Sequence, residues 1–522
     1  MPILTRRDLL AASAGTATAL AGSVVPGVVM AQAGGRASVI DVALLGEAPS
    51  LDPSIFTNDV ASVITQHFLE TLYTFNRRWE ARPLLAAALP ETSADGRTVT
   101  IRLREGVQFH DGKPMQAEDV VASLERWTRL SPRGKLAGAV INSIAASGPN
   151  AVVISLKDRF APLLSLLAMN NGAAIIIPRD LVAEAGEGPI KRYVGTGPYR
   201  FVEHRPDQYV RVARFDGYRS PAGAPDGYAG ERRAILDEIR FLPVPNATTR
   251  LEGVLAGQFL FSENLPTEMY DRLTGRPAVR PLTIEPSWFT FFVMNNKAGP
   301  MANQQIRLAM RAALNMKDML TAGFGEPKFF TATGSIYPEG TAFYDPNNTK
   351  GYNEANPRRA AELLKAAGYN GQPIRILTSQ QFDYLYKMAL VARENLQEAG
   401  FKIDIQVMDW ASLTRKRENE AEWDAFTSLH AFVPEPSLLT FINPRYAGWS
   451  DSPEKRAALS AFNSEPDPAK RVQLWHRVQE IIYEQASTII IGQYYSIAAA
   501  STRLKGFEPM PWAAFWNVSL EG

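Results

Sequence analysis

Histidines are the first residues to consider for catalysis or metal binding, because they exchange protons near neutral pH and are common metal ligands. The chain has five at scattered positions, namely His67, His110, His204, His430 and His476. No two of them stand at the helical spacing of a shared metal site. His110 precedes Asp111-Gly112, but Asp-Gly is a strong turn dipeptide. We therefore interpret this segment as a turn and not as an acid–base pair.

Motifs for nucleophilic or phosphate chemistry are absent from the sequence. It contains no Walker A loop, no G-x-S-x-G elbow, no H-E-x-x-H and no G-x-G-x-x-G. We expect no catalytic residue, no bound metal and no cofactor, and hence a protein that is not an enzyme. An exported hydrolase remains a distant alternative, which turnover of a chromogenic ester or peptide would support.

Aromatic residues are better candidates for ligand contact. Several lie in or near predicted strand ends and loops, namely Trp288, Trp410, Trp423, Phe432, Trp449, Trp512 and Trp516. Their rings can cover an apolar or flat ligand. Most aromatic residues nevertheless belong to the core, so only a minority of these should touch a ligand.

Composition narrows the class of protein. The chain has 522 residues, of which 46% are hydrophobic and 21% charged. It is too long for one hydrophobic core, so two or more lobes are expected. There is no cysteine, which excludes a disulfide, a thiolate metal site and a lipid-bearing cysteine.

The first 33 residues have the pattern of an export signal. Arg6-Arg7 precedes a weakly apolar stretch, and Ala31-Gln32-Ala33 supplies the small residues of a cleavage site. The paired arginines resemble a twin-arginine signal. We expect cleavage after residue 33 and a soluble periplasmic protein that is not a lipoprotein. Removal of this segment leaves equal numbers of basic and acidic residues, so no nucleic acid partner is expected.

The elements that would position these residues alternate between strands and helices. A short apolar run predicts a buried strand over 39–45, and further strands are predicted over 98–104, 374–377 and 403–407. Helical spacing predicts helices over 60–75, 304–320 and 385–396. The order strand, helix, strand between 374 and 407 indicates a parallel, doubly wound α/β unit.

Several segments together resemble one protein family. The stretch from Thr100 to Arg126, TIRLREGVQFHDGKPMQAEDVVASLER, is similar to the signature of family 5 solute-binding proteins of ABC importers. Ser50-Leu-Asp-Pro53, Gly195-Thr-Gly-Pro-Tyr199 and the segment 360–369 resemble further parts of that family in the same order. The resemblance covers essentially the whole chain after residue 33.

The resemblance implies an α/β fold of the periplasmic-binding-protein type (type II, large cluster C), with two lobes and a hinge between them. The first lobe would comprise residues 34–280 and the C-terminal return 487–522, and the second lobe residues 281–486. Such a receptor closes on a solute and delivers it to permease subunits of the importer in the inner membrane. We expect a monomer.

Two positions depart from the pattern of peptide-binding relatives. Where those place an aspartate for the ligand's amino group, this chain has Phe432, three residues before Glu435. Where dipeptide-binding relatives place an arginine for the carboxylate, it has Ser379-Gln-Gln-Phe382. Both changes replace charge by an aromatic ring or an amide, which favours a less charged ligand. Arg133 for a carboxylate, or Glu435 for an ammonium group, would be the alternative partners.

The candidate ligand-binding residues are therefore Phe56, Thr57, Arg133, Trp288, Gln380, Gln381, Phe382, Trp410, His430, Phe432 and Glu435. The solute would be a peptide or a peptide-like compound. The alternatives are a non-peptide solute (an opine, a short saccharide or an aromatic compound) and, more distantly, a chaperone that binds unfolded chains.

Overall fold

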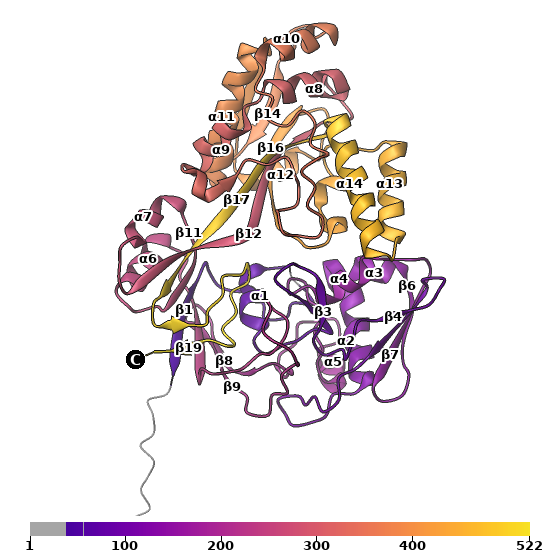
Figure 1. Cartoon of the computed structure of the whole chain (residues 1–522), viewed down its shortest axis with the longest axis vertical. Coiled ribbons are helices and arrows are strands. Elements are labelled where there is room, and N and C mark those ends of the chain that lie inside the picture. Colours follow the sequence, from indigo (N-terminus) through magenta and orange to yellow (C-terminus); the bar gives the residue numbers. More distant parts are fainter. Residues whose placement is uncertain (1–37, 56, 522) are drawn as a thin grey trace, which may run out of the picture. The chain divides into compact units, whose positions relative to one another are not determined.

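The computed structural model of the protein describes residues 38–55 and 57–521. The predicted signal segment 1–33 and the candidate Phe56 lie outside the described residues. The described chain is a mixed α/β structure built around one 11-stranded sheet (Figure 1). The order of ten of its strands is β15-β14-β16-β12-β17-β11-β1-β10-β9-β8, and β13 pairs with β17 outside this path.

In that order, the bounds of the strands are β15 (Ile403–Val407), β14 (Ile374–Thr378), β16 (Ala425–Ala431), β12 (Val279–Met294), β17 (Thr488–Ser501), β11 (Phe261–Leu265), β1 (Val39–Leu44), β10 (Glu238–Pro243), β9 (Tyr209–Arg214), β8 (Tyr199–Arg205) and β13 (Phe330–Thr331). We call the part around β11, β1, β10, β9 and β8 the first lobe. The part around β16, β14 and β15 is called the second lobe.

The first lobe also contains smaller sheets and several helices. Its other strands are β2 (Tyr73–Phe75), β3 (Ala81–Pro83), β4 (Glu91–Thr92), β5 (Thr98–Arg102), β6 (Ile141–Ala146), β7 (Ala151–Leu156), β18 (Leu504–Lys505) and β19 (Ser519–Leu520). Its helices are α1 (Asp59–Thr65), α2 (Ala117–Leu130), α3 (Pro132–Val140), α4 (Leu163–Ala168), α5 (Arg179–Ala185), α6 (Ala247–Leu255), η1 (Thr267–Met269) and α7 (Tyr270–Leu273).

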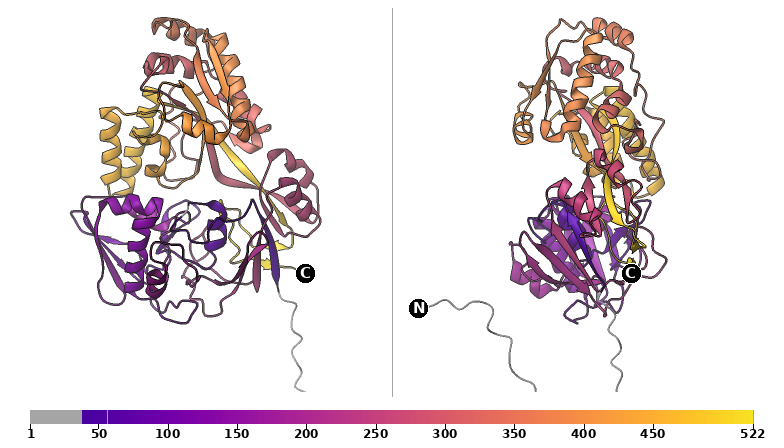
Figure 2. Two further views of the ribbon diagram at one scale, coloured as in Figure 1. Left: turned by 180° about the vertical axis from the view of Figure 1, so that it is seen from behind. Right: turned by 90° about the vertical axis from the view of Figure 1, so that its left-hand side faces the viewer.

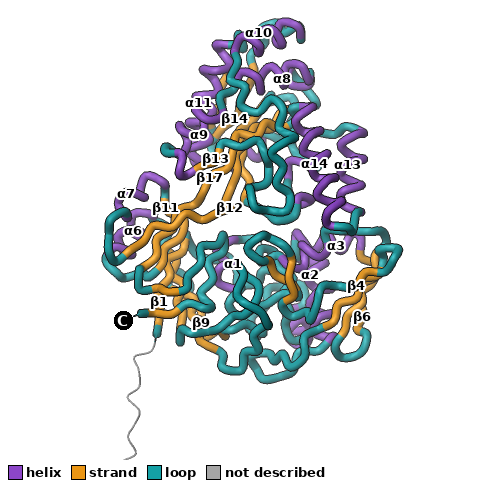
Figure 3. Tube along the Cα trace, in the orientation of Figure 1, coloured by secondary structure: helices purple, strands orange, loops and turns teal. Residues whose placement is uncertain are grey.

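Helices flank the strands of the second lobe on both sides (Figure 3). They are η2 (Pro300–Ala302), α8 (Gln304–Ala313), α9 (Met316–Phe324), η3 (Pro327–Phe329), α10 (Pro357–Ala366), η4 (Gln380–Phe382), α11 (Asp383–Glu398), α12 (Trp410–Lys416), η5 (Pro436–Leu438), η6 (Thr440–Ile442), α13 (Pro453–Ser464) and α14 (Pro468–Gln485). The predicted parallel unit is confirmed, because α11 connects β14 to β15 and these two strands pair in parallel.

Two long strands join the lobes. β12 and β17 pair antiparallel from Val279↔Ser501 at one end to Val293↔Thr488 at the other. Figure 2 shows this ribbon passing from one lobe to the other. The register shifts twice, between Ile284 and Trp288 and between Thr290 and Phe291. The expected division at residues 280/281 falls inside β12, and the one at 486/487 falls just before β17, so these divisions stay predictions.

Two helix predictions were wrong in extent. The segment 60–75 is helical only as far as Thr65, and Tyr73–Phe75 is a strand. The carbonyl groups of His67 and Phe68 instead accept hydrogen bonds from the backbone N–H groups of Tyr199 and Gly197. These distant partners replace the continuation of the helix.

The predicted helix 304–320 is two helices, α8 and α9, with a break at Leu314 and Asn315. Asn315 has extended backbone angles, and its side chain accepts a hydrogen bond from the Asp318 N–H. This is the geometry of an N-cap, which starts a new helix. Across the described ranges, no helix is long and apolar enough to span a bilayer.

Candidate functional site

The carboxyl ends of parallel strands meet at one edge of the sheet in each lobe. β14 is parallel to both β15 and β16, and β1 is parallel to both β10 and β11. Ligands of open α/β sheets bind outside these ends. The segments that follow these strands carry five of the predicted residues: Thr57 and Phe432 in loops, Gln380 and Gln381 in η4, and Trp410 at the start of α12.

Two predicted residues line one hollow in the second lobe. The hollow is lined by Pro286, Trp288, Phe289, Ile336, Pro338, Phe432, Gln493 and Tyr495. Trp288 and Phe432 come from separate parts of the chain, and the sequence indicated both. The walls are mainly apolar, and Gln493 and Tyr495 add polar groups. Such a lining suits a ligand with an apolar body and a few hydrogen-bonding groups.

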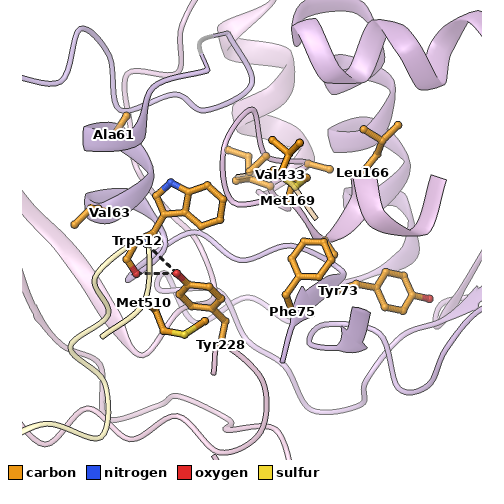
Figure 4. Close-up of a cluster of buried hydrophobic side chains, with 14 of the residues drawn as sticks. Ala61, Val63, Tyr73, Phe75, Leu166, Met169, Tyr228, Val433, Met510 and Trp512 are labelled. Carbon is orange, nitrogen blue, oxygen red and sulfur yellow. Dashed lines mark hydrogen bonds between the residues drawn. The ribbon is translucent and has the colours of Figure 1, made fainter. Parts of the chain in front are cut away.

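Phe432 joins the two lobes. Its ring lies 4.7 Å from that of Trp79 in the first lobe and 6.0 Å from that of Tyr337 in the second, measured between centroids. Only 8% of Phe432 is exposed. The next residue, Val433, lies in a buried apolar cluster with Leu166 and Met169 of the first lobe (Figure 4). The loop after β16 therefore packs against the first lobe.

A row of aromatic residues follows the edge of the second lobe. The Trp410 ring meets that of Phe382 edge to face at 5.0 Å, and Phe382 lies 6.0 Å from Tyr384. The hydroxyl groups of Tyr384 and Tyr494 are 3.0 Å apart, and Tyr494 stacks with Trp288 at 6.5 Å. This row connects two predicted ligand-binding residues to the hollow.

The two predicted glutamines, Gln380 and Gln381, lie next to this aromatic row. Both Gln380 and Gln381 are exposed, and the Gln381 Oε1 accepts a hydrogen bond from the Trp410 N–H at 3.4 Å. Their exposed amide groups are available to a ligand, so the loop between β14 and α11 can offer hydrogen bonds beside aromatic surfaces.

Arg133 and Thr57 lie together in the first lobe. A Cβ atom placed on Gly172 would be 3.0 Å from the Thr57 Cγ2 and 3.1 Å from the Arg133 Cδ. The Arg133 Nε is shielded from solvent and has no hydrogen-bond partner within the described residues. Burial lowers the pKa of Arg133 to about 10, and the negative charge of Asp59 opposes this effect. Arg133 therefore remains a cation.

His430 lies at the end of β16, within range of the Arg133 charge. Its Nδ1 is 2.6 Å from the carbonyl oxygen of Ala431, its Nε2 accepts from the Thr440 N–H at 3.4 Å, and its ring stacks on Phe289 at 5.7 Å. Burial, with a smaller contribution from the charge of Arg133, lowers the pKa of His430 to about 4. The ring is therefore neutral at pH 7, with Nδ1–H as the donor.

Glu435 is engaged elsewhere. Its carboxylate is fully buried and accepts two hydrogen bonds from Arg471, at 2.6 and 2.9 Å. It also accepts from the Ser437 N–H at 3.1 Å. This bidentate pair fixes the loop that carries Phe432. Glu435 is therefore already paired within the protein, and its role is to position this loop.

Asp59 is a neighbour of Arg133 that the sequence analysis missed. Its Oδ1 accepts hydrogen bonds from the Asn171 Nδ2 at 2.6 Å and the Trp512 Nε1 at 2.8 Å. Asp59 and these two partners come from three distant parts of the chain, so no local pattern could have indicated their contact. Among the described residues there is no group of three His, Asp or Glu side chains that could hold a metal ion.

Comparison with known proteins adds a family to this geometry. Residues 80–450 match the model of the bacterial extracellular solute-binding proteins, family 5. The chain belongs to this family.

Relatives of this family 5 protein extend over almost its full length. It is 24% identical to a probable peptide ABC transporter periplasmic-binding protein, y4tO, of Sinorhizobium fredii, over 99% of both chains. Among solved structures, Helicobacter pylori DppA in complex with the peptide STSA has a TM-score of 0.74 and 23% identity, covering 93% of this chain and 98% of DppA. AgaA from A. tumefaciens R10 in complex with agropinic acid has a TM-score of 0.71 and 21% identity, covering 93% and 99%.

These likenesses show the two-lobe fold expected from the sequence. The family is one of solute-binding proteins and not of enzymes. The hollow, the aromatic row and the Arg133 region are thus candidate parts of one solute-binding site in this family 5 protein.

Proposed function

We propose that this protein is the periplasmic receptor of an ABC importer, which captures a peptide or peptide-like solute by closure of its lobes and delivers it to the permease. The observation that carries the proposal is a contact between the lobes at a predicted residue. Phe432 of the second lobe packs on Trp79 of the first, and Phe432 also lines the hollow. A solute between these groups would contact both lobes and stabilise their closed arrangement.

The name of the relative y4tO and the peptide bound by DppA support a peptide as the solute. In this proposal residues 34–280 and 487–522 form one moving body, and residues 281–486 form the other. Export through Arg6-Arg7 would give a mature chain that begins at Gly34. N-terminal sequencing of periplasmic protein tests this start, and an intact Met1 on exported protein would contradict it.

A non-peptide solute is the second candidate. Glu435 is occupied by Arg471, and the loop 379–382 carries glutamines and a phenylalanine beside Trp410. A zwitterionic dipeptide would find neither of the charged partners that peptide-binding relatives use. A ligand with an aromatic or apolar body and hydroxyl or amide groups fits these residues better. The structure of AgaA with agropinic acid supports a non-peptide solute for a protein of this fold.

Lobe closure is tested by solution scattering on ligands found in a thermal-shift screen of a broad solute library. A ligand that binds only the native state raises the unfolding midpoint. We expect the radius of gyration to fall when such a ligand is added and the fluorescence of Trp288 and Trp410 to change. A Trp288→Phe, Trp410→Phe variant controls for the signal of the other tryptophans. A tight ligand that leaves the radius of gyration unchanged would contradict closure.

A further inference from the structure

Arg133, which is partly exposed, differs in its partners from the buried arginines of this protein. Arg126 donates two hydrogen bonds to Asp52, and Arg232 donates to Glu70. Arg250 and Arg307 donate to four and three backbone carbonyl groups, respectively. Within residues 38–55 and 57–521, Arg133 has no hydrogen bond or ion pair. Its Nε is shielded from solvent while the side chain as a whole is partly exposed, so this unpaired cation is open to an anion that arrives from outside.

The surroundings of Arg133 hold its stem and leave its charge uncompensated. Gly172 has φ +68°, and an added Cβ there would press on both the Arg133 stem and the Thr57 methyl group. The nearby carboxylate, Asp59, is already bound by Asn171 and Trp512 and forms no ion pair with Arg133 in the described structure. The guanidinium group is thus positioned but not neutralised.

The helix that carries Arg133 adds to the positive potential. Arg133 is the second residue of α3, after Pro132, and the first turn of this helix contains no acidic residue. The side chain of its N-cap, Ser131, makes no capping hydrogen bond, and its hydroxyl donates to the carbonyl oxygen of Gly172 at 3.1 Å. The positive end of a helix favours an anion. An anion at Arg133 would therefore interact favourably with both the side chain and the helix.

We propose that Arg133 binds a carboxylate group of the solute, with the apolar body of that solute lying toward His430, Phe289 and the hollow. The planar guanidinium group matches a carboxylate with two parallel hydrogen bonds. The ring of His430 stacks on Phe289, which lines the hollow, and as a neutral group it does not compete as a cation for the carboxylate. This inference rests on the proposed solute-binding function and selects carboxylate-bearing peptides or opines over neutral saccharides.

The test compares phenylacetate with its neutral analogue phenylacetamide, and with phenylphosphonate to distinguish a carboxylate from a phosphate-like anion. We expect phenylacetate to raise the unfolding midpoint of the native protein and of Arg129→Met, which alters an exposed arginine on α2. It should fail to do so in Arg133→Met, while phenylacetamide should have no effect in any of the three. An equal effect of phenylacetate on Arg133→Met, no effect on the native protein, or a preference for phenylphosphonate would overturn the carboxylate site.

A second measurement separates this inference from the proposed function. The tightest ligand of the solute library should carry a carboxylate and bind Arg133→Met about 10- to 100-fold more weakly, with Arg133→Lys in between. The ligand could lack a carboxylate, or it could bind Arg133→Met with unchanged affinity, while scattering still reports closure. Either result would contradict Arg133 as the carboxylate-binding residue and leave the receptor function standing. If no ligand closes the lobes, the receptor function itself fails.

Discussion

The Glu435 and Arg133 regions combine a carboxylate and an arginine in opposite ways. In the second lobe, Glu435 and Arg471 satisfy each other through two hydrogen bonds and are buried together. In the first lobe, Asp59 and Arg133 are neighbours whose charges interact, but Asp59 is bound by neutral donors and Arg133 by no described residue. The first arrangement fixes a loop, whereas the second leaves a charge available. The difference distinguishes an ion pair that supports the site from a cation that can receive a ligand.

The largest effect on stability should come from breaking the buried ion pair of Glu435 and Arg471. Glu435→Gln leaves Arg471 buried without its counter-charge, so we expect the free energy of unfolding to fall by about 3–5 kcal/mol. The matched control is Glu454→Gln, which removes an exposed partner of Arg477 and should change stability by about 1 kcal/mol or less. Urea unfolding of both variants provides the measurement. Equal losses in the two variants would mean that the buried pair contributes no more than a surface pair.

An intermediate effect on stability should come from lowering the pH, through protonation of His430. The folded-state pKa of His430, about 4, is below the value near 6.5 of an unfolded chain. The unfolded state therefore binds the proton first as the pH falls, and stability present above pH 6.5 is lost toward pH 4. Between pH 7 and pH 5 the loss from His430 is about 2 kcal/mol.

In His430→Gln this part of the acid-induced loss should disappear, which unfolding curves at the two pH values would reveal. In Arg133→Met the pKa of His430 should rise, because one of the charges that disfavour its protonation is gone. Titration of the ring by nuclear magnetic resonance measures that shift directly. An unchanged pKa of His430 in Arg133→Met would show that the two groups are not coupled.

The smallest effect should be that of Arg133→Met on stability without ligand. Because no described partner loses a hydrogen bond, we expect the free energy of unfolding to stay unchanged or to rise by about 1 kcal/mol. Arg471→Met should lower it by about 3–5 kcal/mol, since Glu435 would then be buried alone. Thermal unfolding should therefore show an unchanged or higher midpoint for Arg133→Met and a lower midpoint for Arg471→Met. A large loss in Arg133→Met would mean that Arg133 supports the fold.

Local patterns in the sequence were sufficient for much of the fold. An apolar run indicated β1, and alternating apolar residues indicated β5, β14 and β15. The prediction failed where distant partners decided the outcome. The helix predicted over 60–75 ends at Thr65 because His67 and Phe68 bond to the segment around Gly197.

The candidate site divides in the same way. Trp288 and Phe432 could be predicted, since aromatic residues next to strand ends have a local signature. Trp79 and Asp59 could not, because their roles depend on contacts with Phe432 and with Asn171 and Trp512. The binding of Glu435 by Arg471, 36 residues away in the sequence, likewise has no sequence signal, which is why Glu435 looked available to a ligand.

The β12–β17 ribbon has a mechanical consequence. Its strands resume pairing with each other beyond each register shift, so both ends of the ladder are held in fixed register. β-Ribbons twist readily about their long axis, and irregular pairing locally increases that twist. A rotation of one lobe against the other would therefore twist this ribbon, most easily between Ile284 and Phe291, where its pairing is irregular. Because the pairing is in register beyond both shifts, such a twist would keep the alignment of Trp288 with Tyr494.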